Sequence, residues 1–201
     1  MMFLFNNVKI ELYKEYIMIL YINCCPREES RTYRLASVLL DKLNEEYEQI
    51  NLYEEDLKPL TRDSLNYRLT LQEKKDYSSE IFRYAKQFAK ADTIVIAAPY
   101  WDLSFPSMLK IYIENVFCIG IVTTYDEKGN PVGLCNAKKL YYVTTAGGTY
   151  HPEYSYGYLH KLVTHYFGIE ETELIMVEKI DIDGYDAKKI MEDKIKEIQG
   201  R

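Results

Sequence analysis

The stretch MILYINCCPREESRT, residues 18–32, passes from a short apolar run into a polar loop. Its first part, residues 18–22, is rich in β-branched and aromatic side chains, which is typical of a strand. Beyond the loop, apolar side chains recur at helical spacing. These are Leu35, Val38, Leu39 and Leu43. The stretch therefore predicts a strand, a loop and a helix in direct succession.

The same succession repeats along the chain. Strand candidates lie at residues 18–22, 48–52, 93–98, 139–145 and 173–178. Apolar stripes at helical spacing accompany them: Ile81, Phe82, Ala85, Phe88 and Ala89; Leu109, Tyr112, Ile113 and Val116; Leu159, Leu162, Val163, Tyr166 and Phe167; and Ile190, Met191, Ile195 and Ile198. We expect Ser104 to cap the helix at Leu109, with Pro106 in its first turn, and Gly168 to end the next helix. Because crossovers between parallel strands are right-handed, this alternation predicts an α/β fold, a doubly wound five-stranded parallel sheet with helices on both faces.

Length and composition limit the organisation of the chain. The 201 residues are 47% hydrophobic, which is enough for one core of ordinary domain size. We expect residues 18–201 to form a single domain and residues 1–17 to be an N-terminal extension that precedes it. Residues 53–77 are charged and weakly periodic, and the sequence predicts no element there.

Charge and cysteine usage exclude several classes of protein. The net charge is −6 and no basic cluster is visible, which disfavours a nucleic-acid partner. No apolar run approaches the roughly 20 residues that span a bilayer. The four cysteines have neither a disulfide framework nor zinc spacing, and no metal site is predicted. A reducing cytoplasm is the expected location.

In an open parallel sheet, ligands bind at the carboxyl ends of the strands, so the loops after the first, third and fourth strands draw attention. The first loop contains Arg27, Ser30, Arg31 and Thr32 and leads into a helix, whose N-terminus favours an anion. Glu28 and Glu29 oppose a phosphate unless they point away. The alternative interpretation is that Ser30 or Thr32 only caps the helix and that the arginines are solvated.

The other two loops suit a planar ligand. Residues 99–106 read PYWDLSFP, in which Tyr100 and Trp101 can form an apolar wall, or can simply pack. Residues 144–151 read TTAGGTYH, in which Gly147 and Gly148 let the backbone approach a flat ligand closely, or form an ordinary turn.

Together these passages resemble the flavodoxin-like family of NAD(P)H:quinone oxidoreductases and FMN-dependent NADH-azoreductases. The similarity covers roughly residues 19–168. Cys25, Pro26 and Arg27 resemble the family's Ser-Pro-Arg phosphate loop, with cysteine in place of serine. Further similar passages are Pro99-Tyr100-Trp101 with Pro106, the loop from Tyr125 to Lys139, and Thr144-Thr145-Ala146-Gly147-Gly148.

The resemblance implies a non-covalent flavin, electron transfer from NAD(P)H through it to a quinone, azo or similar aromatic acceptor, and a homodimer whose partner completes the site. FMN is preferred over FAD because the smaller family members are the more similar. The expected flavin-binding residues are Cys25, Arg27, Ser30, Arg31, Thr32, Pro99, Tyr100, Trp101, Asp102, Leu103, Thr145, Ala146, Gly147 and Gly148. Tyr150 and His151 are expected to provide catalytic hydrogen bonds, so that Tyr150→Phe slows flavin reduction; alternatively Tyr150 packs and His151 lies on the surface.

Other interpretations stay open at this point. Cys25, Arg31 and Thr32 also match the Cys-x5-Arg-Ser/Thr loop of low-molecular-weight tyrosine phosphatases, in which a thiolate is the nucleophile. That family's Asp-Pro general acid is absent from the chain. A non-catalytic flavin-binding electron carrier, or a domain that has lost its cofactor, also fits the predicted fold.

Overall fold

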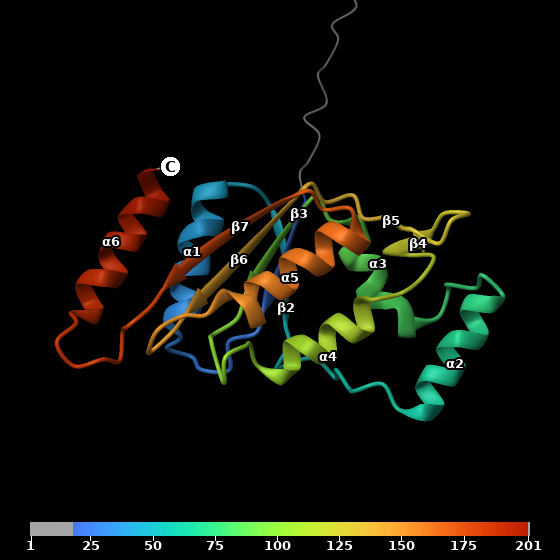
Figure 1. Ribbon diagram of the computed structural model, residues 1–201, viewed down its shortest axis with the longest axis horizontal. Coiled ribbons are helices and arrows are strands. Elements are labelled where there is room, and N and C mark those ends of the chain that lie inside the picture. The colour runs from blue at the N-terminus through green and yellow to red at the C-terminus, as the bar shows by residue number, and fades with distance from the viewer. Residues whose placement is uncertain (1–17, 201) are drawn as a thin grey trace, which may run out of the picture.

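The computed structural model describes residues 18–200, so the predicted extension at residues 1–17 lies outside the described part. Its centre is a five-stranded sheet of order β2-β1-β3-β6-β7, in which every neighbouring pair is parallel. The strands are β1 (Ile19–Asn23), β2 (Tyr47–Asn51), β3 (Thr93–Ala97), β6 (Lys139–Thr145) and β7 (Glu171–Val177). The order reverses at β1 and β3, and this confirms the predicted doubly wound α/β fold (Figure 1).

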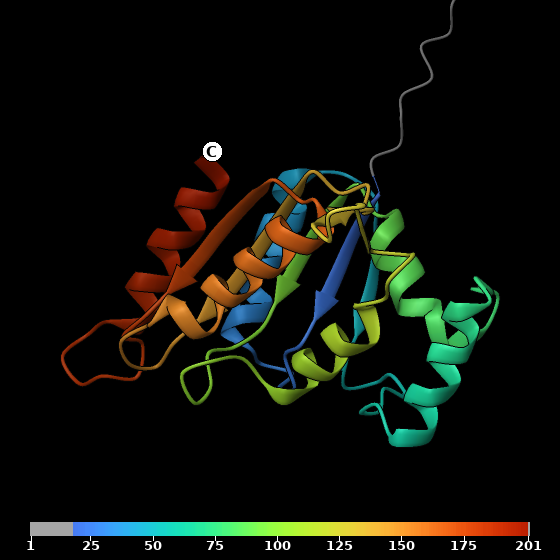
Figure 2. The same ribbon diagram turned by 45° about the vertical axis from the view of Figure 1, so that its right-hand side comes forward.

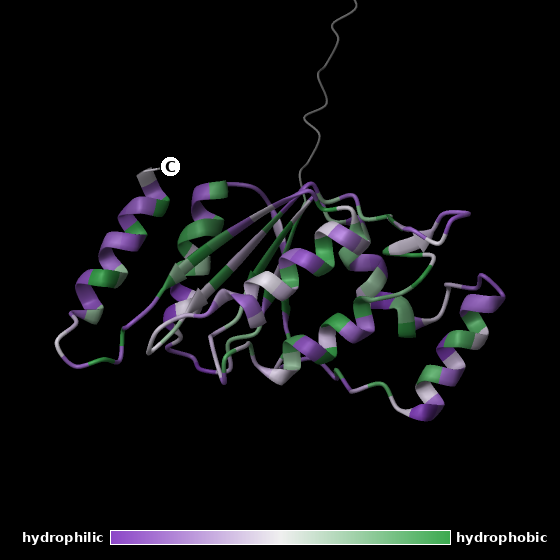
Figure 3. Ribbon diagram, in the orientation of Figure 1, coloured by the Kyte–Doolittle hydropathy of each residue, from purple (hydrophilic) through white to green (hydrophobic). Residues whose placement is uncertain are grey.

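Helices cover both faces of the sheet. One layer contains α1 (Arg31–Leu43) and α6 (Ala187–Gly200), which contact each other, and the other contains α3 (Arg83–Lys90), α4 (Ser107–Val116) and α5 (Tyr156–Leu162) (Figures 1 and 2). Side chains alternate between the layers along β1: Ile19 and Tyr21 pack beside α1, whereas Leu20 and Ile22 belong to the core under α3, α4 and α5. Figure 3 shows green segments along the central strands, whereas the connecting loops range from purple to green.

Two elements lie outside the predicted pattern. The weakly periodic segment contains α2 (Arg62–Glu73), which begins with a capping box formed by Thr61 and Ser64 and buries only Arg68. That guanidinium donates to the carbonyl oxygens of Glu114 and Phe117, so it satisfies the C-terminus of α4. The second is a hairpin of β4 (Thr123–Tyr125) and β5 (Pro131–Gly133) before β6.

Two predicted helix boundaries have different outcomes. Gly168 ends the helical segment as predicted: α5 continues as a wider π turn (Val163–Phe167), and Gly168 follows with φ 78°, which favours glycine. The capping role expected of Ser104 is wrong, because α4 begins only at Ser107, directly after Pro106. The Ser104 hydroxyl instead donates to the carbonyl oxygen of Tyr154 at 2.8 Å.

Between residues 18 and 200, none of the helices combines the length and the apolar character that crossing a bilayer requires.

Candidate functional site

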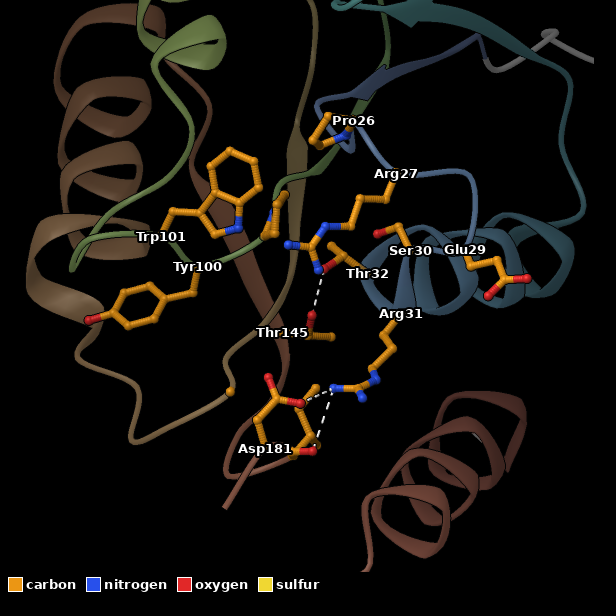
Figure 4. A pocket seen from close by; sticks show the side chains of 13 residues that line it. Pro26, Arg27, Glu29, Ser30, Arg31, Thr32, Tyr100, Trp101, Thr145 and Asp181 are labelled. Atoms are coloured by element: carbon orange, nitrogen blue, oxygen red, sulfur yellow. Dashed lines mark hydrogen bonds and ion pairs between the residues drawn. The ribbon is translucent and has the colours of Figure 1, made fainter. Parts of the chain in front are cut away.

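A cavity of about 310 Å³ lies at the carboxyl edge of the sheet, where the loops after β1, β3, β6 and β7 meet (Figure 4). Arg31, Trp101 and Gly147, which are far apart in the sequence, all line it. The other lining residues are Pro26, Arg27, Glu29, Ser30, Thr32, Pro99, Tyr100, Thr145, Ile180 and Asp181. The structure therefore brings the three predicted loops together and adds the loop after β7, which sequence analysis did not include.

The start of α1 forms one end of the cavity. Ser30 is the N-cap, and its hydroxyl accepts from the backbone N–H of Tyr33 at 3.2 Å. Thr32 is buried and its hydroxyl is 2.7 Å from that of Thr145, which ties the helix to β6. Within residues 18–200, the N–H groups of Arg31 and Thr32 have no hydrogen-bond acceptor. Free N–H groups and the helix dipole together favour an anion at this point.

Two arginines differ in their availability to such an anion. Arg31 donates to Asp181 at 2.7 Å, so its charge is already paired. Arg27 has no hydrogen-bonding or ionic partner among the described residues, and its side chain extends into the cavity (Figure 4). The Glu29 carboxylate points the other way, and Glu28 does not line the cavity. The predicted repulsion from the glutamates is therefore small, and Arg27 is the available cation.

The loop after β3 forms an aromatic wall that rests on a strained turn. Trp101 and Ser104 exchange two backbone hydrogen bonds, of 3.0 and 2.8 Å, across Asp102 and Leu103. Both central residues have positive φ, 51° and 66°, as in a type I′ turn, at a cost of about 1–2 kcal/mol each without glycine. Asp102 and Leu103 form the exposed tip and do not line the cavity, whereas Tyr100 and Trp101 do.

The loops after β6 and β7 run side by side. The N–H of Lys179 donates to Gly148 O at 2.9 Å, and that of Asp181 donates to Gly147 O at 3.0 Å. A Cβ on Gly147 would lie 2.5 Å from Asp181 Oδ2, so a side chain at this position would displace the Asp181 carboxylate. Ala146 is buried, and neither Ala146 nor Gly148 lines the cavity. Asp181 could have been predicted as a site residue from the sequence, because it follows the fifth parallel strand and so lies at the same edge of the sheet as the other loops.

Tyr150 and His151 lie behind the cavity wall. The buried Tyr150 hydroxyl is 2.8 Å from Ser155 Oγ, and its ring meets that of Tyr100 edge-on at 4.8 Å between centroids. The exposed His151 donates its backbone N–H to the Tyr100 hydroxyl at 3.3 Å. Both residues therefore contact Tyr100, and their catalytic role stays a prediction.

Cys25 is buried in the loop after β1 and does not line this cavity. Its side chain is 7% exposed, and its thiol donates to Ala97 O at 3.7 Å. Burial raises the pKa of this thiol to about 11. The thiol therefore stays protonated near neutral pH, which does not support the thiolate nucleophile of the phosphatase alternative.

Comparisons with known proteins agree with this geometry. A family model described as flavodoxin-like fold matches residues 18–201. The chain is 35% identical over 187 residues to the FMN-dependent NADH:quinone oxidoreductase of Clostridium beijerinckii, covering 88% of this chain and 93% of the relative. It is 36% identical over 195 residues to FMN-dependent NADH:quinone oxidoreductase 2 of Clostridium acetobutylicum, covering 90% and 96%.

A solved structure shows the same fold. The FMN-dependent NADH-azoreductase of Bacillus anthracis, in complex with FMN, superposes with a TM-score of 0.76 at 24% identity, over 91% of this chain and 96% of that one.

Proposed function

The chain belongs to the flavodoxin-like fold family, and from that membership we propose that it is an FMN-dependent oxidoreductase that transfers two electrons from NADH to a quinone or azo acceptor. The observation that carries the proposal is the cavity at the sheet edge, with an anion-binding helix start at one end and an aromatic wall at the other. The relatives named above, at 35% and 36% identity, are FMN-dependent NADH:quinone oxidoreductases.

The residues present fit a flavin mononucleotide. The unpaired N–H groups at the start of α1 and the partnerless Arg27 suit its phosphate. Tyr100 and Trp101 offer an apolar wall for its flat ring. When bound, FMN supplies the two-electron chemistry that the side chains lack.

The residues of the chain hold the flavin and orient it. Arg27 and the start of α1 anchor the phosphate, and the hydrogen bond between Thr32 and Thr145 fixes the distance between that anchor and β6. The hydrogen bond from Tyr100 N–H to Thr145 O, of 3.1 Å, keeps the aromatic wall in register with β6. Trp101, 38% exposed, leaves one side of the site accessible to a nicotinamide and then to an aromatic acceptor.

The absorption spectrum of the purified full-length chain is the first test, and we expect that of a flavin, which heating releases as FMN. Anaerobic NADH is expected to bleach it, and benzoquinone or methyl red to restore it. A colourless protein that does not bind added FMN would contradict the proposal. A flavin that neither NADH nor NADPH bleaches would favour the electron carrier instead.

We further propose a homodimer. Leu103 and Tyr154 are large, exposed side chains near the cavity, and a second copy that covers them, with Trp101 left open, would complete the site. Light scattering after size exclusion is expected to give twice the mass of 23.7 kDa, and a single-chain mass at micromolar concentration would count against the dimer.

The expected location is the cytoplasm, because all four cysteines are free. Cell fractionation of the native source tests this, and recovery in the extracellular fraction would contradict it.

A further inference from the structure

An ion pair borders the cavity on the side of β7. Arg31, in the first turn of α1, donates from Nη1 to Asp181 Oδ1 at 2.7 Å and to the carbonyl oxygen of Ile180 at 3.5 Å. The pair joins two segments that are 150 positions apart, and Figure 4 shows it spanning the lower side of the cavity. The Arg31 side chain thus lies between the start of α1 and the Asp181 carboxylate.

The position of Asp181 is set by the backbone around it. Its N–H donates to Gly147 O, and its carboxylate lies against Gly147, in space that a Cβ would occupy. The preceding residue, Ile180, is buried and anchors the loop. The backbone contacts of this loop therefore hold the Asp181 carboxylate at the cavity wall.

This arrangement bears on which flavin the site accepts, an inference that rests on the proposed function. FMN ends in one phosphate, which the start of α1 and Arg27 can bind. FAD carries a second phosphate and an adenosine beyond that point. On the side of β7 the second phosphate would meet the Asp181 carboxylate, and Arg31 cannot compensate because Asp181 already pairs with it.

The side of the cavity at Pro26 and Arg27 is no more favourable to the second phosphate of FAD. A neighbouring hollow shares Pro26 and Arg27 with the cavity, but it is also lined by the carboxylates of Glu28 and Glu54. We infer that Asp181, held by Arg31 and Gly147, is a specificity-determining residue that selects FMN against FAD by closing the phosphate end of the site.

The test measures flavin affinity of the full-length chain after removal of its flavin. FMN and FAD are titrated separately and followed by flavin fluorescence, for the unaltered chain and for Asp181→Asn, Asp181→Ala and Asp183→Asn. Asp183 is exposed, lies in the same loop and has no partner among the described residues, so Asp183→Asn is a control with the same change of charge. Asp181 is 63% exposed, so its replacement leaves the fold intact, which thermal unfolding monitors.

We expect the unaltered chain to bind FMN more tightly than FAD. Both Asp181 variants should reduce the ratio of the two dissociation constants about tenfold, mainly by tighter FAD binding, because one repulsive charge is removed. Asp183→Asn should leave the ratio unchanged. An unchanged ratio in the Asp181 variants, or an equal change in Asp183→Asn, would overturn this inference alone. A chain that binds neither flavin would overturn the proposed function as well.

Discussion

At the scale of single residues, Arg27 is the cation that the free chain leaves available in the cavity. Arg31 is neutralised by Asp181, whereas Arg27 has no partner among the described residues. We expect Arg27→Ala to raise the dissociation constant of FMN roughly 10- to 100-fold, because a charge-assisted hydrogen bond to the phosphate is worth about 1.5–3 kcal/mol. Fluorescence titration measures this change. Arg34→Ala, an exposed position of α1 that does not line the cavity, is the matched control, and equal losses in the two variants would show that Arg27 acts only through general charge.

Tyr150 does not line the cavity and contacts Tyr100, which does. Its hydroxyl bonds Ser155 and its ring supports Tyr100, which lines the cavity. We therefore expect Tyr150→Phe to slow flavin reduction by NADH a few-fold, and Ser155→Ala to slow it by a similar factor, because both remove the same buried hydrogen bond, worth about 1 kcal/mol. Stopped-flow absorbance measures both rates. Slowing that is confined to Tyr150→Phe would indicate direct contact with the flavin, and unchanged rates in both variants would remove Tyr150 from the mechanism.

At the scale of elements, the β4–β5 hairpin is attached to the end of α5 by two glycines. A Cβ on Gly133 would lie 2.2 Å from both Gly168 N and Phe167 C, which are backbone atoms that cannot move aside cheaply. We expect Gly133→Ala to lower the free energy of unfolding by about 3 kcal/mol, at the upper end of overpacking effects. Urea denaturation measures this loss. Gly148→Ala is the control, because nothing lies within 4 Å of its added Cβ, and equal stability of the two variants would disprove the close contact.

At the scale of the whole molecule, the buried thiols should make the free energy of unfolding fall as the pH rises into the alkaline range. Burial raises the pKa of Cys24 from an ordinary 9.0 to about 12, and that of Cys25 to about 11. Unfolding restores ordinary values, so above pH 9 the unfolded chain holds fewer protons than the folded one. The contribution of the thiols is therefore complete below about pH 9 and is lost as the pH rises through the folded pKa values, by up to about 1.4 kcal/mol per pH unit for each thiol.

Urea denaturation at a series of pH values tests this dependence. The free energy of unfolding should be level up to about pH 8.5 and then fall, with a shallower slope in Cys24→Ala because one titrating group is gone. Burial also raises the pKa of Tyr112 and Tyr142 well above the usual value, so these phenols should steepen the fall at higher pH. Constant stability up to pH 11 would contradict the prediction.

The sequence predicted those features that depend on neighbouring residues. Apolar periodicity located the five strands of the sheet and the helices between them, and glycine marked the end of the α5 segment at Gly168. The rule that ligands bind at the carboxyl edge then selected the loops that contain Arg31, Trp101 and Gly147, which line one cavity. The helix α2 escaped prediction because its exposed surface carries little periodic signal and it buries only Arg68.

The class of fold and the edge of the sheet at which the site lies follow from the amino-acid sequence, because apolar periodicity and turn-forming residues are local properties of the chain. The pairing of Asp181 with Arg31, the contact of Thr32 with Thr145 and the packing of Cys25 against Ala97 depend on the folded arrangement of the chain. Those contacts join residues that are more than 70 positions apart. They exist because the doubly wound sheet places the ends of separate strands side by side, and no periodicity along the chain encodes that arrangement.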